Sequence, residues 1–193
     1  AIFSSVVTGS PTAATLFRLS MLADVFGYYL PLIPLAIFLW WWLHPGFPLL
    51  SALLTAAGVG ASLLGAAGAA SLGQVLPALN SQYVVASASH REVLVVVGGA
   101  VTTAVYNGIW NTLDATVGGA WWLGTGYLLR QIRPRLGILW MLTGIASLID
   151  ALGFITGAGG VALAGLFPFL ALVPISSGAL ALDLLRRPVE PPP

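Results

Sequence analysis

Residues 130–156 read RQIRPRLGILWMLTGIASLIDALGFIT, in which three arginines and a proline precede a long apolar run. An α-helix needs about 20 predominantly apolar residues to cross the hydrocarbon core of a bilayer. Charged side chains are costly inside that core, so they collect at the ends of spans. This stretch therefore predicts a transmembrane helix that begins at the arginines and carries a single acidic residue, Asp150.

The composition of the whole chain supports the same class. Of its 193 residues, 58% are hydrophobic and 7% are charged, with a mean hydropathy of +0.96. Soluble domains carry about 25% charged residues, so this chain lacks the means to cover a water-facing surface. Without cysteine it forms no disulfide or thiolate metal site, and without lysine no Schiff base. A net charge of +1 provides no basic surface for nucleic acid.

We predict an all-α fold, a polytopic membrane helix bundle of about six transmembrane helices with both ends cytoplasmic. A single transmembrane domain is expected over residues 1–187, and a disordered proline-rich tail over 188–193. Turn residues mark most boundaries, such as His44-Pro45-Gly46 after the first span and Gly157 to Gly160 before the last. The predicted spans are residues 19–43, 49–76, 92–113, 115–130, 135–156 and 160–185.

Two of these boundaries depend on weaker signals. Pro77 is expected to end the second span, because the following stretch to His90 is the most polar part of the chain and resembles a loop. Residues 92–130 would measure roughly 60 Å as one helix, about twice the hydrocarbon thickness. We therefore expect a break between Asp114 and Gly119, where two glycines can turn.

The arginines set the predicted orientation. With six spans, all seven fall on one face together with both ends of the chain, and the positive-inside rule makes that face cytoplasmic. Tryptophan favours membrane interfaces, and all but Trp140 map to the opposite boundary. These are Trp40, Trp41, Trp42, Trp110, Trp121 and Trp122.

Polar side chains within the spans indicate one candidate site. Thr103, Asn107, Asn111 and Asp114 share one helical face by their spacing. Ionisable groups inside spans are costly and usually face a bundle interior, so they are functional candidates. The candidate intramembrane polar or ligand site comprises Asp114, Asp150, Asn107, Asn111, Ser147 and His44.

If the two carboxylates meet, proton sharing or cation binding is the expected chemistry. The competing interpretation is structural, because Asn, Ser and Thr commonly bond across helices and hold a bundle together without any ligand. No metal site is predicted, since His44 and His90, the only histidines, lie on opposite faces.

The remaining acidic residues are expected to have arginine partners. Asp24 and Tyr28 form a secondary candidate on the first span, although an arginine, Arg18, Arg91 or Arg130, is the more ordinary neighbour for Asp24. Asp183 lies three and four residues before Arg186 and Arg187, which predicts a pairing along one helix face.

Small residues and prolines indicate how the helices pack. Ala61, Gly65, Ala69 and Gly73 recur every four residues and form a smooth ridge for close helix approach, either within the chain or against another subunit. Prolines within spans accompany broken helices in some transporters, and here they are Pro31, Pro34, Pro168 and Pro174.

Three segments carry a family resemblance: Phe17-Arg-Leu-x-x-Leu-x-Asp24, Trp110-Asn-x-Leu-Asp114 and Gly119-x-Trp-Trp-Leu-Gly-x-Gly-x-Leu-Leu-Arg130. With these, the chain resembles small bacterial multi-pass membrane proteins of unknown function over most of residues 16–187. The resemblance implies the fold and a bacterial inner (plasma) membrane location. It also implies a helix upstream of Ala1, which that family often has.

The leading functional hypothesis is a non-enzymatic membrane protein, either an accessory or packing subunit or a binder of a small apolar ligand. We expect no cofactor beyond a bound lipid or apolar ligand. The expected partners are the lipid bilayer and a homo-oligomer or larger membrane complex. The alternative is a small proton-linked transporter that uses the Asp and Asn cluster. A membrane-embedded enzyme comes third, because the chain has no nucleophile elbow, P-loop or HExxH motif.

Overall fold

The computed structural model describes residues 4–187, and within that range it consists of helices without strands. The predicted all-α fold is confirmed, and the predicted tail over 188–193 lies outside the described residues. The elements are α1 (Ser4–Thr8), α2 (Pro11–Asp24), η1 (Val25–Tyr29), α3 (Leu30–Leu43), α4 (Pro48–Val85), α5 (Ala88–Thr103), η2 (Ala104–Asp114), α6 (Ala115–Ile132), α7 (Pro134–Thr156) and α8 (Gly159–Arg186), where η denotes a π-helix.

Some of these elements are continuous with one another, so the described residues hold five helices long and apolar enough to cross a membrane. The last two match the predicted spans closely. Pro134 occupies the first turn of α7, and Gly157, with a φ of 71°, ends that helix in the left-handed conformation that suits glycine. The five helices are Pro11–Leu43, Pro48–Val85, Ala88–Ile132, Pro134–Thr156 and Gly159–Arg186.

The predicted break between Asp114 and Gly119 is wrong, because the chain stays helical from Ala88 to Ile132. Gly118 and Gly119 are buried within α6, and they serve packing instead of a turn. A methyl group added at Gly119 would lie 2.9 Å from Cγ of Leu148 on α7. Glycine here permits a close approach between two helices. A pair of glycines looks the same in the sequence whether it forms a turn or packs against a neighbouring helix.

The predicted end at Pro77 is also wrong, since α4 continues to Val85. The polar stretch that follows Pro77 is helical up to Val85, and one of its polar side chains is buried. The Asn80 side chain donates hydrogen bonds to the carbonyl oxygens of Val7 (3.0 Å) and Gly9 (2.9 Å), and it is only 2% exposed. Asn80 thereby ties α4 to the N-terminal segment.

Two helices contain π-helical turns, which accommodate an extra residue and are frequent at functional sites. The short one, η1, ends two residues before Pro31, so the missing N–H of that proline falls next to an already irregular turn. The long one, η2, carries Asn107 and Asn111 and ends at Asp114. By contrast, α8 stays continuous despite its two internal prolines.

The chain divides into two compact units, residues 1–31 with 63–110 and residues 32–62 with 111–193. In the first unit, the small-residue ridge of α4 packs within the chain, as the intramolecular interpretation predicted. A methyl at Gly65 would strike the ring of Tyr29, and one at Gly73 would lie 2.8 Å from Cβ of Met21. The core of this unit is made by Val6, Val7, Ala14, Met21, Ala69, Leu72, Leu76, Leu94 and Val105.

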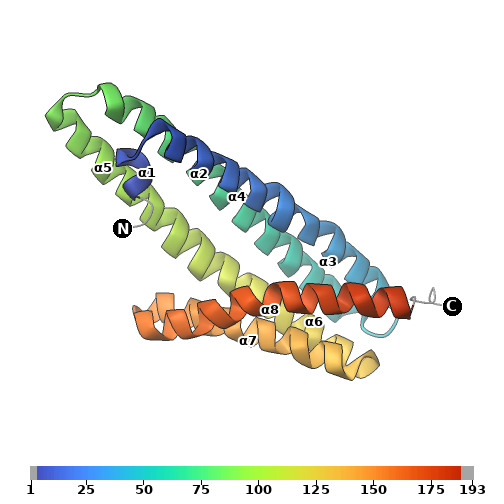
Figure 1. Cartoon of the computed structure of the whole chain (residues 1–193). Coiled ribbons are helices and arrows are strands. Elements are labelled where there is room, and N and C mark those ends of the chain that lie inside the picture. Colours follow the sequence, from blue (N-terminus) through green and yellow to red (C-terminus); the bar gives the residue numbers. More distant parts are fainter. Residues whose placement is uncertain (1–3, 188–193) are drawn as a thin grey trace. The chain divides into compact units, whose positions relative to one another are not determined.

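In the second unit, α6, α7 and α8 follow one another in antiparallel contact, and α7 and α8 lie side by side in Figure 1. Glycines make these contacts close. A methyl at Gly126 would lie 2.6 Å from the backbone nitrogen of Met141, and one at Gly153 would strike the backbone of Ala162. The interior of the three helices therefore has little free space, and a polar side chain buried there must find its partners locally.

Candidate functional site

The buried face of α7 carries a row of polar side chains between two other helices. Trp140, Thr143, Ser147 and Asp150 follow at intervals of three, four and three residues, which places them on one helical face. All four are at most 2% exposed. Ser147 and Asp150 belong to the site predicted from the sequence, and the indole of Trp140 joins the same row in the structure.

Asp150 is the unusual member, because its carboxyl group is buried with an unmet hydrogen-bonding need. The residue is 2% exposed, and its Oδ1 atom has no hydrogen-bond partner. Gly165 allows α8 to approach the backbone here, since a methyl at that position would lie 2.7 Å from Cα of Asp150. The α8 backbone thus packs on the backbone of Asp150, while Oδ1 of the side chain stays buried without a donor.

Ser147, one turn before Asp150, connects α7 to the start of α6. Its hydroxyl donates to the carbonyl oxygen of Ala115 at 2.8 Å. Ala115 directly follows Asp114, so the structure brings Ser147 next to the chain segment that carries the other predicted carboxylate. Ser147 thus provides a hydrogen bond between α7 and α6.

Thr143 connects α7 to α8. Its hydroxyl oxygen lies 3.2 Å from that of Ser176, which is fully buried. The indole N–H of Trp140 donates to the carbonyl oxygen of Ser176 at 3.3 Å. These bonds satisfy buried polar groups in the manner expected of interhelical contacts.

No hydrogen bond joins Asp114 to Oδ1 of Asp150, because that atom is without a partner. Asp114 is half-buried, and its own Oδ1 lies 3.6 Å from where a Cβ on Gly118 would be. The carboxyl of Asp114 thus lies beside the α6 face that Gly118 presents to Ala61 of α4.

The other members of the predicted cluster have different surroundings. Asn111 is buried, while Asn107 is exposed and belongs to the first unit. His44 is exposed just beyond the end of α3, where its ring meets Trp40 edge-on at 5.2 Å between centroids. The wider turns of η2 place Asn107 and Asn111 differently from the α-helical stripe that the spacing predicted.

Asp24 and Tyr28 lie in the first unit, and both are half-buried. The expected arginine partners of Asp24 are engaged elsewhere. Arg18 donates to the side chain of Gln74, Arg91 donates to two backbone carbonyls of α4, and Arg130 lies over the Tyr127 ring. The predicted ion pair of Asp24 is therefore wrong among the described residues. Tyr28 contacts the neighbouring Tyr29 ring edge-on at 4.8 Å.

Asp183 also has a different partner from the one predicted. Its carboxylate accepts from Nε of Arg133 at 3.0 Å, across 50 positions of sequence. Arg133 precedes α7, and the antiparallel contact of α7 with α8 brings it to the end of α8. Helix pairing overrides the local spacing to Arg186 and Arg187, which predicted the wrong arginine.

Three tryptophans of the second unit, on α6 and α7, form part of its core. Trp121, Trp122 and Trp140 pack together with ring centroids 4.3 to 5.8 Å apart, and each is at most 2% exposed. Trp121 and Trp122 are covered by neighbouring helices, and their predicted depth near a membrane interface stays a prediction. In the first unit, the indole of Trp110 donates to the carbonyl oxygen of Gly65 at 3.1 Å.

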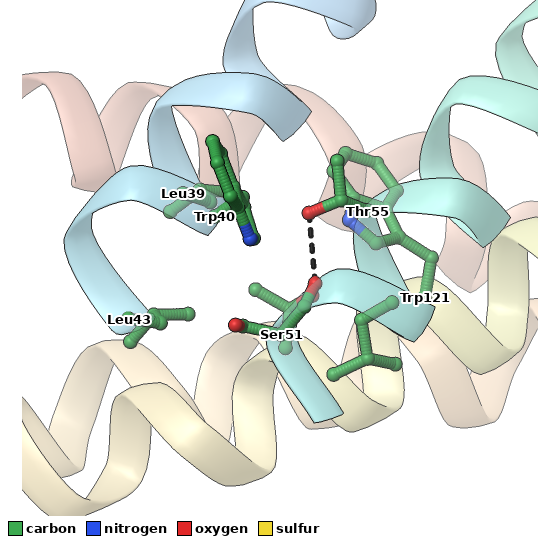
Figure 2. Close-up of a pocket in the computed structure, with 8 residues that line it drawn as sticks. Leu39, Trp40, Leu43, Ser51, Thr55 and Trp121 are labelled. Atoms are coloured by element: carbon green, nitrogen blue, oxygen red, sulfur yellow. Dashed lines mark hydrogen bonds between the residues drawn. The ribbon is translucent and has the colours of Figure 1, made fainter. Parts of the chain in front are cut away.

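A groove in the second unit bears on the hypothesis that the protein binds a small apolar ligand (Figure 2). It combines apolar walls with hydroxyl groups, and Thr55 bonds back to the carbonyl oxygen of Ser51 at 2.8 Å. The groove is too narrow to admit a water molecule in this conformation. Its lining residues are Leu39, Trp40, Leu43, Ser51, Leu54, Thr55, Trp121 and Thr125.

The geometry therefore defines a protein of apolar helices compatible with a multi-pass membrane protein, and its most unusual polar feature is a buried carboxyl. Within residues 4–187, no group of three or more His, Asp or Glu side chains is placed to hold a metal ion. Comparison of the chain with protein-family models, curated proteins and solved structures finds no match. The function is accordingly argued from the site alone.

Proposed function

We propose that this protein is a small proton-linked transporter of the bacterial inner membrane in which Asp150 carries the proton. The observation that supports it is the buried Oδ1 atom of Asp150, which lacks a hydrogen-bond partner in a helix apolar enough to span the bilayer. This favours the transport hypothesis over a purely structural role.

The energetic argument concerns the charged form of Asp150. An ionised carboxylate buried without a partner costs several kcal/mol, and a protein avoids that cost by neutralising the group. Arg133 is paired with Asp183, and among the described residues no arginine is paired with Asp150. Proton binding is then the simplest way for Asp150 to exist in this position, and ionisable residues inside spans commonly belong to ion pathways.

The proposed orientation follows from α6, α7 and α8. The C-terminal end of α6, the start of α7 and the C-terminal end of α8 carry five of the seven arginines, and the Arg133–Asp183 bond joins two of these ends. The positive-inside rule then makes this end cytoplasmic, together with the C-terminal end of α8. Asp150 lies in the half of α7 farther from the arginines.

The test is proton flux into proteoliposomes that contain a trapped pH-sensitive dye. After an external acid step, the purified protein should acidify the lumen faster than protein-free liposomes do. Asp150→Asn should abolish the difference, since the amide cannot take up and release a proton. Glu92→Gln is the matched control and should retain the flux, because Glu92 is exposed on α5 and lies outside the buried row of α7. Equal flux in Asp150→Asn and the wild type would contradict the proposal.

The groove of Figure 2 combines apolar walls with hydroxyl groups between α3, α4 and α6, so a second candidate is binding of a small apolar ligand that widens the groove. A brominated fatty acid should quench tryptophan fluorescence saturably, and Trp40→Phe should reduce the saturable part, to which Trp121 also contributes. Quenching that rises linearly with fatty acid concentration would indicate partition into lipid and exclude this site. The accessory-subunit hypothesis stays a prediction, to be checked by mass spectrometry of the protein purified with its native partners.

A further inference from the structure

We infer that Asp150 exchanges its proton with the arginine-rich end of α7 through the buried hydroxyls of Ser147, Thr143 and Ser176. This inference rests on the proposed function, and it specifies the side from which the buried carboxyl is reached. Hydroxyl groups suit such a path because each one both donates and accepts hydrogen bonds.

The hydroxyls follow one another along α7, and a hydrogen bond joins two of them across the contact with α8. With a rise of 1.5 Å per residue, Ser147 lies about 4.5 Å along the helix axis from Asp150, and Thr143 about 6 Å further. The Thr143 and Ser176 oxygens are 3.2 Å apart across the α7–α8 contact. All three hydroxyl residues are at most 1% exposed, so they form a polar line through an otherwise apolar interior.

The line leads toward a polar end of the bundle. One turn before Thr143, the Trp140 indole bonds to the backbone of Ser176. At the end of the same helices lies the Arg133–Asp183 ion pair, whose side chains are each 25% exposed. A proton that leaves Asp150 in this direction therefore moves from a fully buried group toward groups in contact with solvent.

The opposite direction is shorter but apolar. From Asp150 to the turn at Gly157, α7 contributes Ala-Leu-Gly-Phe-Ile-Thr, in which the one hydroxyl, that of Thr156, is exposed at the helix end. Over residues 159–175, α8 has no polar side chain at all. A methyl at Gly153 would strike the backbone of Ala162, so the two helices close on each other there. Between α7 and α8, this side offers neither buried hydroxyls nor room for water.

Few other charged groups lie on the elements that pack against Asp150. On α8 they are Asp183 and Arg186, and on α7 Arg135, all at the arginine-rich end. On α6 the charged residue is Arg130 at the same end, and Asp114 precedes the first residue of that helix. The hydroxyl row is thus the polar connection that these helices provide between Asp150 and the arginine-rich end.

The experiment measures how fast the Asp150 proton exchanges with deuterium. In reconstituted full-length protein, a protonated buried carboxyl gives an infrared C=O band that shifts in D₂O, and Asp150→Asn assigns the band by removing it. Thr143→Val and Ser176→Ala should slow the shift about tenfold each, the effect of a barrier higher by ~1.4 kcal/mol. Thr143→Ser should restore the rate, because it returns the hydroxyl.

Thr156→Val is the matched control at the other end of α7, and it should leave the exchange rate unchanged. Unchanged rates in Thr143→Val and Ser176→Ala, with the band present, would overturn the proposed path but leave Asp150 as the proton carrier. Slower exchange in Thr156→Val alone would place the path on the opposite side. Absence of any band that Asp150→Asn removes would overturn the proposed function itself, and the path with it.

Discussion

At the residue scale, glycine decides how closely the helices of the second unit approach. A Cβ on Gly144 would lie 2.7 Å from Cα of Leu123 and would strike that residue's backbone nitrogen. Backbone atoms of a packed helix cannot move aside as a flexible side chain can. The same is true of Gly165 beside Asp150, so the environment of the buried carboxyl also depends on a missing methyl group.

We therefore predict that Gly144→Ala destabilises the protein by about 1–3 kcal/mol, the usual cost of overpacking a filled interior. Gly160→Ala, in the exposed first turn of α8, is the matched control, because a Cβ there meets nothing within 4 Å. Equilibrium unfolding in detergent micelles with added SDS measures both variants. Equal stability of the two would show that α6 and α7 can separate at no cost.

Also at the residue scale, Asp183 shows why local spacing misassigned a partner. Positions three and four apart on one helix are always close, so Arg186 and Arg187 were reasonable predictions. The observed partner, Arg133, comes from another helix, and its position depends on where α7 and α8 meet. Asp150 differs from Asp183, because no arginine lies near it in the sequence and its Oδ1 atom has no hydrogen-bond partner.

At the element scale, α6 and α7 are joined by aromatic packing as well as by glycines. The rings of Trp121 and Trp122 pack on Trp140, whose indole also bonds to the α8 backbone. The Trp140 side chain thus connects its own helix, α7, with both α6 and α8. The sequence placed tryptophans at a membrane interface by their usual preference, and it had no means to distinguish an interfacial ring from a buried one.

We expect Trp140→Ala to lower the free energy of unfolding by about 3–5 kcal/mol, the cost typical of emptying a buried aromatic site. Trp41→Ala should have little effect, because Trp41 is 42% exposed. Thermal unfolding followed by circular dichroism compares the two variants under the same detergent conditions. A larger loss for Trp41→Ala than for Trp140→Ala would contradict the assignment of the core.

At the scale of the whole molecule, the number of crossings determines which arginines share a side. Six spans place all seven on one face. Five continuous helices, each crossing once, place Arg18 and Arg91 on one side and the other five arginines on the opposite side. The difference arises from one helix, Ala88–Ile132, in which the predicted turn is helical.

Single-cysteine labelling distinguishes these arrangements cleanly, because the chain has no native cysteine. Ser89→Cys and Gln131→Cys lie at the two ends of the Ala88–Ile132 helix, and both positions are exposed. If this helix crosses once, a membrane-impermeant maleimide should label them from opposite sides of oriented vesicles. Labelling from the same side would support the six-span arrangement and contradict a single crossing.

By itself, the sequence determined the properties that depend on composition and on neighbouring residues. The all-α class, the bounds of α7 and α8, and the turn at Gly157 all follow from apolar length, proline and glycine. It also identified Asp150 and Ser147, because polar residues are rare within apolar helices. Only the tertiary structure decided the Arg133–Asp183 pair, the burial of three tryptophans and the missing partner of the Asp150 carboxyl. A contact between helices depends on residues that are far apart in the chain. A glycine looks the same in the sequence whether it forms a turn or packs against a helix, and a tryptophan looks the same whether it lies at a membrane interface or in a core.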